Sequence, residues 1–421
     1  MKRLTTTIVL LLLTVPLLLA QRMFTVHGTV SDSLSGKPLA RVSIAAQGSG
    51  VQGVATVTND QGQFLLKVPG GQLQSLTVSM LGYKSRRIRL GSDAGHLKIV
   101  LQPSSVTLDE IIVRADEAER IVRLALSKVA DNYSREPVLY KGFYRETVQK
   151  RRQFISISEA VVDMYKTSYT QDIDREAVAI TRGRRLLNMK SADTLGVKIM
   201  GGPMLPIMAD VVKNSELLFY AEDMPCYRFE LGVPEKLDDR LQYVVHMTPR
   251  QPRSYALYCA TLYIDQQTLA FTRAELSLDM SRRQPAVAAM LVSKPSTLRF
   301  HPRELSFHID YRTEDGVTYL SYVRNTMRFT CDWRRRLFAS AFTTVSEFVV
   351  TDRQCSGKPC ARPSRGLDTF SRRDKLYDCV EYFSDPDFWG PDNIIEPTET
   401  LDKAIERLKK RVTATEKRGG G

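Results

Sequence analysis

The feature of this sequence that most constrains its fold is a recurring alternation of apolar and polar residues. Between residues 24 and 101, apolar side chains take every second position in short runs, and clusters of Gly, Asn, Asp and Ser separate the runs. Because successive side chains of a β-strand point to opposite faces, a period of two predicts strands joined by turns. About seven strands in roughly 80 residues predict a β-sandwich. The alternating sets are Phe24, Val26 and Val30; Val42, Ile44 and Ala46; Phe64, Leu66 and Val68; Leu76, Val78 and Met80; Ile88 and Leu90; and Leu97, Ile99 and Leu101.

Five short motifs occur in order along these strands. They are His27-Gly-Thr-Val-Ser-Asp32, Gly36-Lys-Pro-Leu39, Val42-Ser-Ile44, Asn59-Asp-Gln-Gly-Gln-Phe64 and Val78-Ser-Met-Leu-Gly-Tyr83. Together they resemble the carboxypeptidase-regulatory-like domain. The resemblance implies a transthyretin-like sandwich, which occurs at the N-terminus of many Bacteroidota envelope proteins, including TonB-dependent receptors. Gly36 and Gly62 stand where the turns need a permissive backbone.

The segment Leu108-Asp-Glu-Ile-Ile-Val-Arg114 resembles the stretch that follows this sandwich in TonB-dependent receptors. A receptor barrel of about 22 strands would not fit into the roughly 300 residues that follow. We therefore do not expect such a receptor. An intramolecular strand is expected here, and pairing with a partner chain is the alternative.

The first 20 residues have the pattern of a secretory signal peptide. Lys2 and Arg3 form a positive start, Ile8 to Leu13 and Val15 to Leu19 are apolar, and Ala20 offers a cleavage site before Gln21. The apolar stretch is short for a transmembrane helix and contains Pro16. We expect cleavage, with an uncleaved anchor as the alternative. No other segment approaches spanning length.

Export changes the interpretation of the basic charge. The chain has 60 Lys and Arg against 47 Asp and Glu, a net charge of +13. Outside the cytoplasm, the anionic partners are lipid head groups, lipopolysaccharide or acidic glycans rather than nucleic acid. The basic residues occur in scattered pairs and triplets without interleaved aromatic residues, so we predict no nucleic-acid site and mostly solvated polar faces.

Six cysteines in an exported protein permit disulfides. They are Cys226, Cys259, Cys331, Cys355, Cys360 and Cys379. Connectivity does not follow from sequence, because six cysteines allow many pairings. The local candidate is Cys355 with Cys360, since the intervening Gly357 and Pro359 favour a turn. Metal ligation by this pair would need two more ligands and no His lies nearby, so a disulfide or two free thiols is the expectation.

Beyond the sandwich, a helix and then a second β-rich region are predicted. Residues 116–134 carry Ile121, Val122, Ala125 and Val129 at helical spacing, and Glu-Pro at 136–137 ends the run. Long alternating runs then follow as hairpins, which predicts an antiparallel meander. In the hairpin arm 270–280, Ala270, Thr272, Ala274, Leu276, Leu278 and Met280 are expected to face inward. A C-terminal helix is predicted around Leu401, Ile405 and Leu408, with Thr400 as a candidate N-cap.

Two further resemblances concern this β-rich region. The stretch ending Leu-Tyr-Ile-Asp265, followed by a long amphipathic strand, resembles periplasmic lipoprotein-carrier half-barrels. The segments 140–146, 158–165 and 388–396 resemble uncharacterised Bacteroidota envelope proteins with the same N-terminal sandwich, a likeness that implies no activity. A curved sheet can enclose a ligand, but a filled core is the commoner outcome and is the expectation here.

No catalytic pattern is expected to be functional. His301-Pro-Arg-Glu304 has the letters of a zinc carboxypeptidase motif, but the next and last His, His308, is only four residues beyond Glu304. In a strand, residues 301 and 304 should point to opposite faces, whereas Glu304 and His308 share the polar face. His246 is expected to be solvated. We predict no catalytic, cofactor-binding or metal-binding residues, because catalytic zinc normally needs three protein ligands.

These patterns predict a mainly β protein. It has a seven-stranded transthyretin-like sandwich, a short linker helix, and a large antiparallel β-meander of half-barrel type with a C-terminal helix. The expected function is that of a non-catalytic envelope protein, an interaction or assembly module on the periplasmic side of the outer membrane. A carrier or sensor of a lipid-like ligand, or a carboxypeptidase-type hydrolase with an unrecognised site, is the alternative. The expected divisions are 1–20, 21–103, 104–137, 138–352 and 353–421.

Overall fold

The fold was examined in a computed structural model. It describes residues 23–48, 53–69, 73–90, 95–104, 115–187, 197–333, 339–354, 362, 369–370, 374, 376–382 and 388–419. The predicted signal peptide, the segment 108–114 and the pair Cys355 and Cys360 lie outside these ranges. In the described part of the chain, no helix is both long enough and apolar enough to cross a bilayer.

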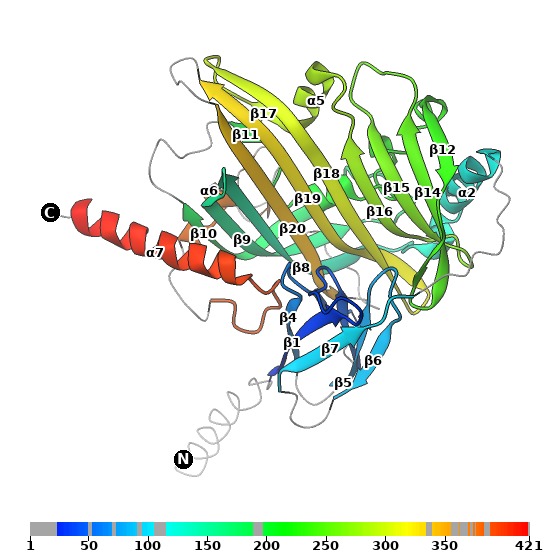
Figure 1. Cartoon of the computed structure of the whole chain (residues 1–421), viewed down its shortest axis with the longest axis horizontal. Coiled ribbons are helices and arrows are strands. Elements are labelled where there is room, and N and C mark those ends of the chain that lie inside the picture. Colours follow the sequence, from blue (N-terminus) through cyan, green and yellow to red (C-terminus); the bar gives the residue numbers. More distant parts are fainter. Residues whose placement is uncertain are drawn as a thin grey trace, which may run out of the picture.

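The N-terminal module is a sandwich of two sheets with seven strands, as predicted (Figure 1). The alternating side chains meet between the sheets, where Val26, Ile44, Phe64 and Leu66 are buried. One sheet has the order β4-β1-β7, with β4 Gln63–Pro69, β1 Met23–Asp32 and β7 Leu97–Leu101. The other has the order β3-β2-β5-β6, with β3 Ala55–Val57, β2 Ser43–Gly48, β5 Leu73–Ser79 and β6 Arg86–Arg89.

The large domain is one curved sheet of 13 strands, which is antiparallel except that the short strand β22 runs parallel to β10 (Figure 1). A meander runs from β14 to β20, and the earlier strands β8, β9 and β10 are added beside β20, the last of the meander. Long alternating runs therefore become long hairpins, as predicted. The strands are β8 Val138–Lys150, β9 Gln153–Lys166, β10 Ala177–Leu187, β12 Tyr227–Leu231, β13 Glu235–Leu237, β14 Arg240–Pro249, β15 Tyr258–Asp265, β16 Phe271–Leu278, β18 Leu298–Glu314, β19 Val317–Trp333, β20 Ser340–Gln354, β21 Thr369–Phe370 and β22 Glu381–Tyr382.

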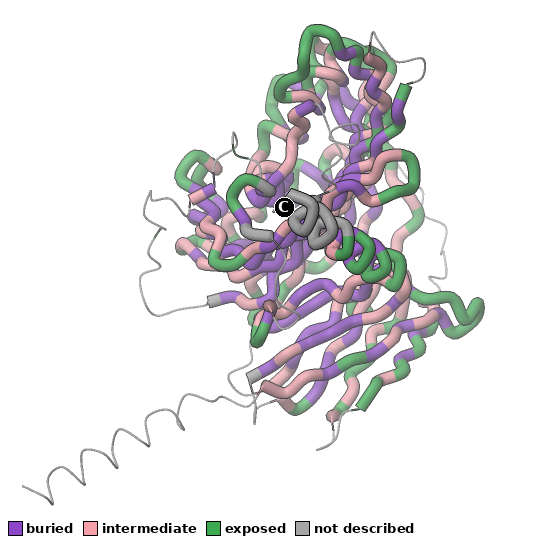
Figure 2. The backbone as a smooth tube through the Cα atoms, turned by 90° about the vertical axis from the view of Figure 1, so that its left-hand side faces the viewer, coloured by how far each residue is buried: buried purple, intermediate pink, exposed green. Residues whose placement is uncertain are grey.

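The inner face of this sheet is filled by the protein's own short elements. Ile207, Val211 and Phe219 from the segment 204–219 pack with Phe271 and Phe329 of the sheet in one apolar core. Figure 2 shows buried backbone running along the strands and exposed backbone at the turns and on the C-terminal helix. The covering elements are α2 Ala115–Ser127, α3 Val129–Asn132, β11 Lys198–Ile199, α4 Leu205–Ala209, η2 Ser215–Leu217, η3 Met224–Cys226, α5 Arg283–Met290 and β17 Leu291–Ser293.

The predicted linker helix forms as two pieces rather than one. Ile121, Val122 and Ala125 are buried against the sheet, as their spacing predicts. The helix breaks at Lys128, which is the N-terminal flank of α3, and the chain is extended again at Tyr133. The tyrosine is buried and its hydroxyl donates to the Phe271 carbonyl oxygen. This tertiary anchor ends the helix before the expected Glu-Pro stop.

Two β-bulges alter the sequence-based assignment of faces. In the hairpin β15–β16, Tyr263 pairs with Arg273 and Ile264 with Phe271, so Thr272 is the extra residue. Its hydroxyl donates to Gln242 Oε1, and Thr272 lines a cavity outside the apolar core. The prediction that Thr272 faces the core with Ala274 was wrong, because a bulge shifts the alternation by one residue.

The second bulge is at Arg303 in β18. His301 pairs with Thr330 and Glu304 with Arg328. Thr330 and Arg328 are two residues apart on β19 and share a face, so His301 and Glu304 share that face as well. The prediction that they point to opposite faces was wrong for this reason.

The C-terminal region closes the structure on its outer side. Residues 388–397, which we call the C-terminal segment, run between the module and the sheet and lead into α7, Glu399–Gly419. Leu401, Ile405 and Leu408 pack on Ile157 and Leu186 as one cluster. The N-cap is Thr398 rather than the predicted Thr400, because its Oγ1 accepts the Leu401 N–H at 3.2 Å. The remaining helix is α6, Leu376–Cys379.

The module is fixed to the outer face of the sheet through a shared apolar cluster. Val57 and Leu65 of the module pack with Phe143 and Tyr322 of the sheet and Trp389 of the C-terminal segment. Polar contacts continue the interface: the Gly53 N–H donates to Glu314 Oε1 at 3.3 Å. Three parts of the chain that are far apart in sequence therefore form one body.

Candidate functional site

A row of polar side chains crosses the outer face of the large sheet from strand to strand. Each residue of the row is the direct pairing partner of the next, over ten adjacent strands. Side chains directly opposite one another in antiparallel strands are close enough to interact, so such a row can act as a unit. The row runs Glu230, His246, Thr261, Glu275, His308, Arg324, Glu347, Arg145, Glu159 and Arg184.

One end of this row is buried and serves to hold the C-terminal segment. One carboxylate oxygen of Glu159 accepts a hydrogen bond from Arg145 Nε at 2.6 Å, and the other accepts one from Arg184 Nε at 2.7 Å. Arg145 also donates to the Ile395 carbonyl oxygen, and the Arg184 guanidinium lies 4.6 Å from the centre of the Trp389 ring. Burial alone would raise the pKa of Glu159, but the two guanidinium groups lower it below its ordinary value. These charges have a structural role.

The other end of the row is open. Glu230, His246, Glu275 and His308 line a groove of about 670 Å³, and Arg41 of the module reaches its edge. The exposed residues Cys259 and Ser277 add a thiol and a hydroxyl to the same surface. The row residues make much of the strand-borne floor polar, and Met247, Leu276 and Phe307 also line the groove. Such a mixed lining suits a polar ligand or a protein surface.

His308 is the most strongly engaged residue of the groove. Its Nε2 lies 2.9 Å from Asp310 Oδ2, and its Nδ1 lies 3.3 Å from Glu275 Oε1. Burial alone would lower the pKa of His308, but the carboxylate of Asp310 raises it above its ordinary value. Asp310 also forms an ion pair with Arg273, whose Nε donates to Asp310 Oδ1 at 2.6 Å. The imidazole ring therefore lies between two carboxylates, and neither of its nitrogens is free to act as a base.

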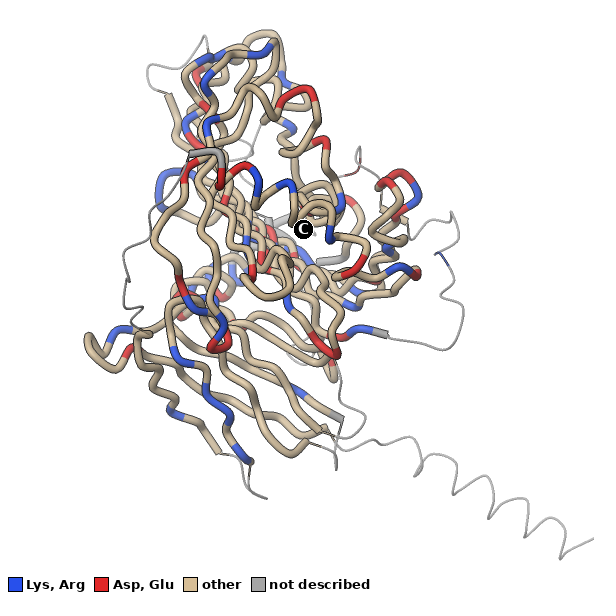
Figure 3. Tube along the Cα trace, turned by 90° about the vertical axis from the view of Figure 1, so that its right-hand side faces the viewer, with Lys and Arg blue, Asp and Glu red and all other residues tan. Residues whose placement is uncertain are grey.

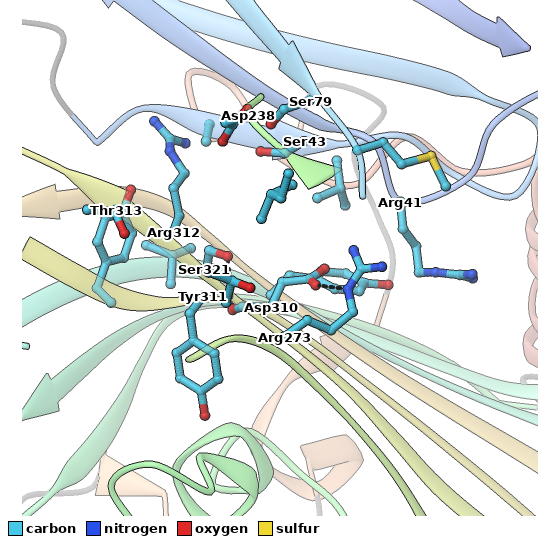
Figure 4. Close-up of a pocket in the computed structure, with 18 of the residues that line it drawn as sticks. Arg41, Ser43, Ser79, Asp238, Arg273, Asp310, Tyr311, Arg312, Thr313 and Ser321 are labelled. Carbon is cyan, nitrogen blue, oxygen red and sulfur yellow. Dashed lines mark hydrogen bonds and ion pairs between the residues drawn. The ribbon is translucent and has the colours of Figure 1, made fainter. Parts of the chain in front are cut away.

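A second, more enclosed cavity of about 320 Å³ lies between the module and the sheet (Figure 4). Arg41 lines this cavity and the groove, so the two adjoin. We call them together the interdomain cleft. Figure 4 shows Ser43 and Ser79 of the module on one side, Arg273 and Asp310 on the other, and Tyr311 pointing away from the cavity.

Arginine is the prominent charged residue of the cavity wall. Arg240 pairs with Asp265 at 2.8 Å and Arg273 with Asp310 at 2.6 Å, so both charges are neutralised. Arg312 pairs with Glu314 at 3.1 Å, yet its Nη1 is buried without a hydrogen-bond partner in the described part of the protein. Arg41, whose φ of 59° lies in the left-handed region, stands at one end of the cavity, and its side chain points away from the cavity (Figure 4).

The residues singled out in the sequence have different fates in the structure. His246 and His308 come together in the groove, while His301 and Glu304 lie farther along β18, where Glu304 pairs with Arg328 at 3.0 Å. Across the described residues, no group of three or more His, Cys, Asp and Glu is arranged to hold a metal. The described cysteines are free thiols: Cys226, Cys259, Cys331 and Cys379.

A separate cluster of charges is buried beneath the inner face. Lys166 Nζ lies 2.9 Å from Asp210 Oδ2 and 3.2 Å from Glu176 Oε2, and Lys213 Nζ lies 3.7 Å from Glu176 Oε1. Tyr311 donates to the other oxygen of Asp210 at 2.8 Å. Burial lowers the pKa of Lys213, whereas for Lys166 Asp210 and Glu176 raise the pKa against the effect of burial. The four charges bind one another, which fits an anchor for the segment 204–219.

Sequence reasoning missed the key residues of the cleft. These residues, Arg41, Arg273, Asp310 and Arg312, belong to no sequence motif. Arg41 lies in a turn, where a polar residue is common. The usable signal was the run of alternating polar residues on β18, which includes His308, Asp310 and Arg312. That run marks a polar face but does not indicate which neighbouring strands complete it.

Comparison with known proteins supports the module and leaves the large domain without an assigned family. Residues 26–113 match the model described as the CarboxypepD_reg-like domain. No curated protein matches the chain. The N-terminal resemblance and the sandwich fold are thus confirmed, and the chain combines this domain with a large antiparallel β domain.

Two solved structures with partial similarity cover the β domain. A DUF1329 family protein from Desulfovibrio piger shares 11% identity, with 58% of this chain and 95% of that chain covered and a TM-score of 0.24. A LolA superfamily protein from Nitrosomonas europaea shares 13% identity, with 56% and 94% covered and a TM-score of 0.22. At these TM-scores the superpositions assign no fold family.

Proposed function

We infer that this protein is a non-catalytic interaction or assembly protein of the cell envelope, exported by its N-terminal segment and acting on the periplasmic side of the outer membrane. The observation that supports this proposal is that other parts of the chain cover both faces of the large sheet. Its inner face is packed with Ile207, Phe219 and other side chains of the protein itself, and its outer face carries the module. Recognition is therefore assigned to the interdomain cleft.

A carrier of a lipid-like ligand is the first alternative. Carriage of an acyl chain requires an apolar cavity that opens to solvent. The described inner face is largely packed with the protein's own side chains, and the pocket of about 640 Å³ beside Tyr169 and Phe219 is lined by polar residues such as Asp172 and Lys213 as well as by apolar ones. The interdomain cleft carries charged and hydroxyl groups together with apolar side chains. These features favour assembly over carriage.

A hydrolase is the second alternative, and one observation favours it: His246, His308 and Glu275 converge in the groove. His308 is bound on both ring nitrogens, which leaves His246, whose Nδ1 lies 3.1 Å from Thr261 Oγ1, as the candidate base. A panel of chromogenic ester and peptide substrates, tested with the protein and its His246→Gln variant, distinguishes a hydrolase from a non-catalytic protein. We expect no hydrolysis that depends on His246.

The proposal is tested by site-specific photo-crosslinking in the cells that make the protein. A photoreactive residue replaces Ser277, an exposed position in the groove, and a control replaces Val292, which is 47% exposed on β17. A discrete protein adduct at position 277 that is absent at 292 is expected. No adduct at 277, or the same adducts at both positions, would contradict an interaction site in the cleft.

A further inference from the structure

We propose that one side of the N-terminal module is a contact surface for an anionic lipid bilayer. The surface consists of Arg86, Arg87 and Arg89 on β6 together with Lys98 on β7, and we call it the basic face. It is separate from the interdomain cleft. The proposal therefore goes beyond the function proposed above and can fail independently of it.

The basic face is formed where the edges of the two module sheets meet. β6 is the last strand of one sheet, and β7 is the last strand of the other. The Lys84 N–H donates to the Gln102 carbonyl oxygen at 2.9 Å, and Arg86 Nη1 donates to the Val100 carbonyl oxygen at 2.9 Å. The two edge strands therefore lie side by side (Figure 1), and cations that are separated in the sequence share one surface.

The described part of the protein does not neutralise the charges of this face. All four side chains belong to exposed residues, and none of them forms an ion pair among the described residues. Arg86 binds the Val100 carbonyl oxygen, and Arg87 Nε donates to the Ser75 hydroxyl at 2.9 Å. Both acceptors are uncharged, so the face keeps its positive charge.

The acidic residues of the module point elsewhere. Its described ranges hold eight Lys and Arg residues against two acids, Asp32 and Asp60. Asp32 accepts backbone N–H groups of its own turn, and Asp60 lies 3.3 Å from Arg324 of the large sheet. In Figure 3, basic and acidic segments are mixed over the large domain, whereas the module carries mainly basic ones.

The face ends where the module meets the large domain. Lys84 precedes β6, but the hydroxyl of the adjacent Ser85 donates to Asp238 Oδ1 at 2.6 Å. An acidic group therefore stands at this end of the module, and Lys84 is not counted with the face.

The arrangement of the cations fits a lipid surface rather than a single small anion. Four charges spread along two strands can meet several phosphate groups at once, and an anionic leaflet favours binding by about fivefold per Lys or Arg. Val100, which is 42% exposed, lies two residues from Lys98 on the same side of β7. An apolar group among cations suits the boundary between head groups and acyl chains.

Binding is measured by sedimentation of the mature protein with vesicles of phosphatidylglycerol mixed with phosphatidylcholine, and with vesicles of phosphatidylcholine alone. Polyglutamate, a soluble polyanion, is added as a competitor. The variants are Arg89→Gln and Lys98→Gln. The matched control is Arg299→Gln, which removes an exposed arginine from the start of β18, whereas the module contacts β18 at Glu314, near the other end of that strand. Circular dichroism checks that each variant is folded.

We expect saturable binding to the vesicles that contain phosphatidylglycerol and none to phosphatidylcholine alone. Binding should weaken about fivefold in Arg89→Gln and in Lys98→Gln, stay unchanged in Arg299→Gln, and disappear at high salt. Because the contact is electrostatic, salt releases the bilayer and no lipid stays with the purified protein.

Three outcomes overturn the proposal. Absence of binding to phosphatidylglycerol vesicles leaves the cations as protection of the sheet edges against strand pairing. An equal loss in Arg299→Gln assigns the binding to net charge. Full competition by polyglutamate at the same concentration of charge assigns the face to an acidic polymer instead. Photo-crosslinking at Ser277 does not involve this face, so the two proposals are tested separately.

Discussion

His308 shows how a single residue of the outer face depends on its neighbours. It joins Glu275 and Asp310, and Arg273 binds Asp310 from the next strand. Because the pKa of His308 is raised in the folded protein, protonation and folding favour each other. The stabilisation is fully present below the unfolded pKa of about 6.5 and is lost as the pH rises through the higher folded pKa.

This linkage predicts a pH-dependent effect of His308→Gln. The variant should lose the most unfolding free energy, relative to the unmodified protein, near pH 6, and the difference should shrink toward pH 9. Urea unfolding at both pH values measures it. His301→Gln is the matched control: burial and nearby arginines lower the pKa of His301, so its removal should give a relative gain at low pH. A difference for His308→Gln that grows with pH would contradict the assignment.

At the scale of elements, the turns of the module depend on two glycines in the left-handed region. Gly36 has a φ of 66° and Gly62 a φ of 72°. A Cβ at position 62 would lie 2.5 Å from the Val30 carbonyl oxygen, whereas a Cβ at position 36 meets nothing within 4 Å. Both turns fit the sequence-based expectation, but only the structure separates backbone strain from steric conflict.

The pair gives a controlled prediction. Gly36→Ala should cost about 1 kcal/mol for the left-handed backbone alone. Gly62→Ala should cost roughly 1–3 kcal/mol more, because the methyl group must also displace the backbone around Val30. Chemical denaturation of both variants gives the comparison. Equal losses would show that the turn at Gly62 relaxes without cost.

Much of the element-level structure was predictable from sequence, and the exceptions have physical causes. A period of two identified the module strands and the hairpin β15–β16, because the pattern is local. Thr272 and Arg303 are single extra residues that change which side chains of their strands point to each face of the sheet. Such a bulge has little effect on the sequence pattern, so it is hard to predict. The polar row could not be predicted from the sequence, because Arg145 and Glu347 become neighbours only when β8 pairs with β20.

At the scale of the whole molecule, the C-terminal segment joins the module to the sheet. Asn393 exchanges two hydrogen bonds with the backbone of Lys67 on β4, at 2.6 and 2.8 Å. Trp389 packs edge-on against Phe143 with ring centres 5.3 Å apart and is 5% exposed. Figure 3 shows acidic and basic residues interspersed around this body. The docking therefore depends on this apolar contact and on local pairs rather than on opposed charged faces.

Removal of Trp389 should loosen this arrangement. Trp389→Ala is expected to cost about 3–5 kcal/mol of unfolding free energy, the range for deleting a large buried aromatic side chain. Hydrogen exchange should increase in β4, whose edge Asn393 covers. Tyr220→Ala, at a position 41% exposed, serves as the control and should change stability by less than about 0.5 kcal/mol. Unchanged exchange in β4 would show that the module docks without the segment.

The central claim is that the large sheet encloses its own side chains and the protein acts through its interdomain cleft. Native mass spectrometry of the mature protein, purified from the cells that make it, tests this most directly. The account predicts the mass of the polypeptide or of a complex with another protein, with no lipid bound. A stoichiometric lipid mass that is lost on denaturation would contradict the filled interior and establish a carrier instead.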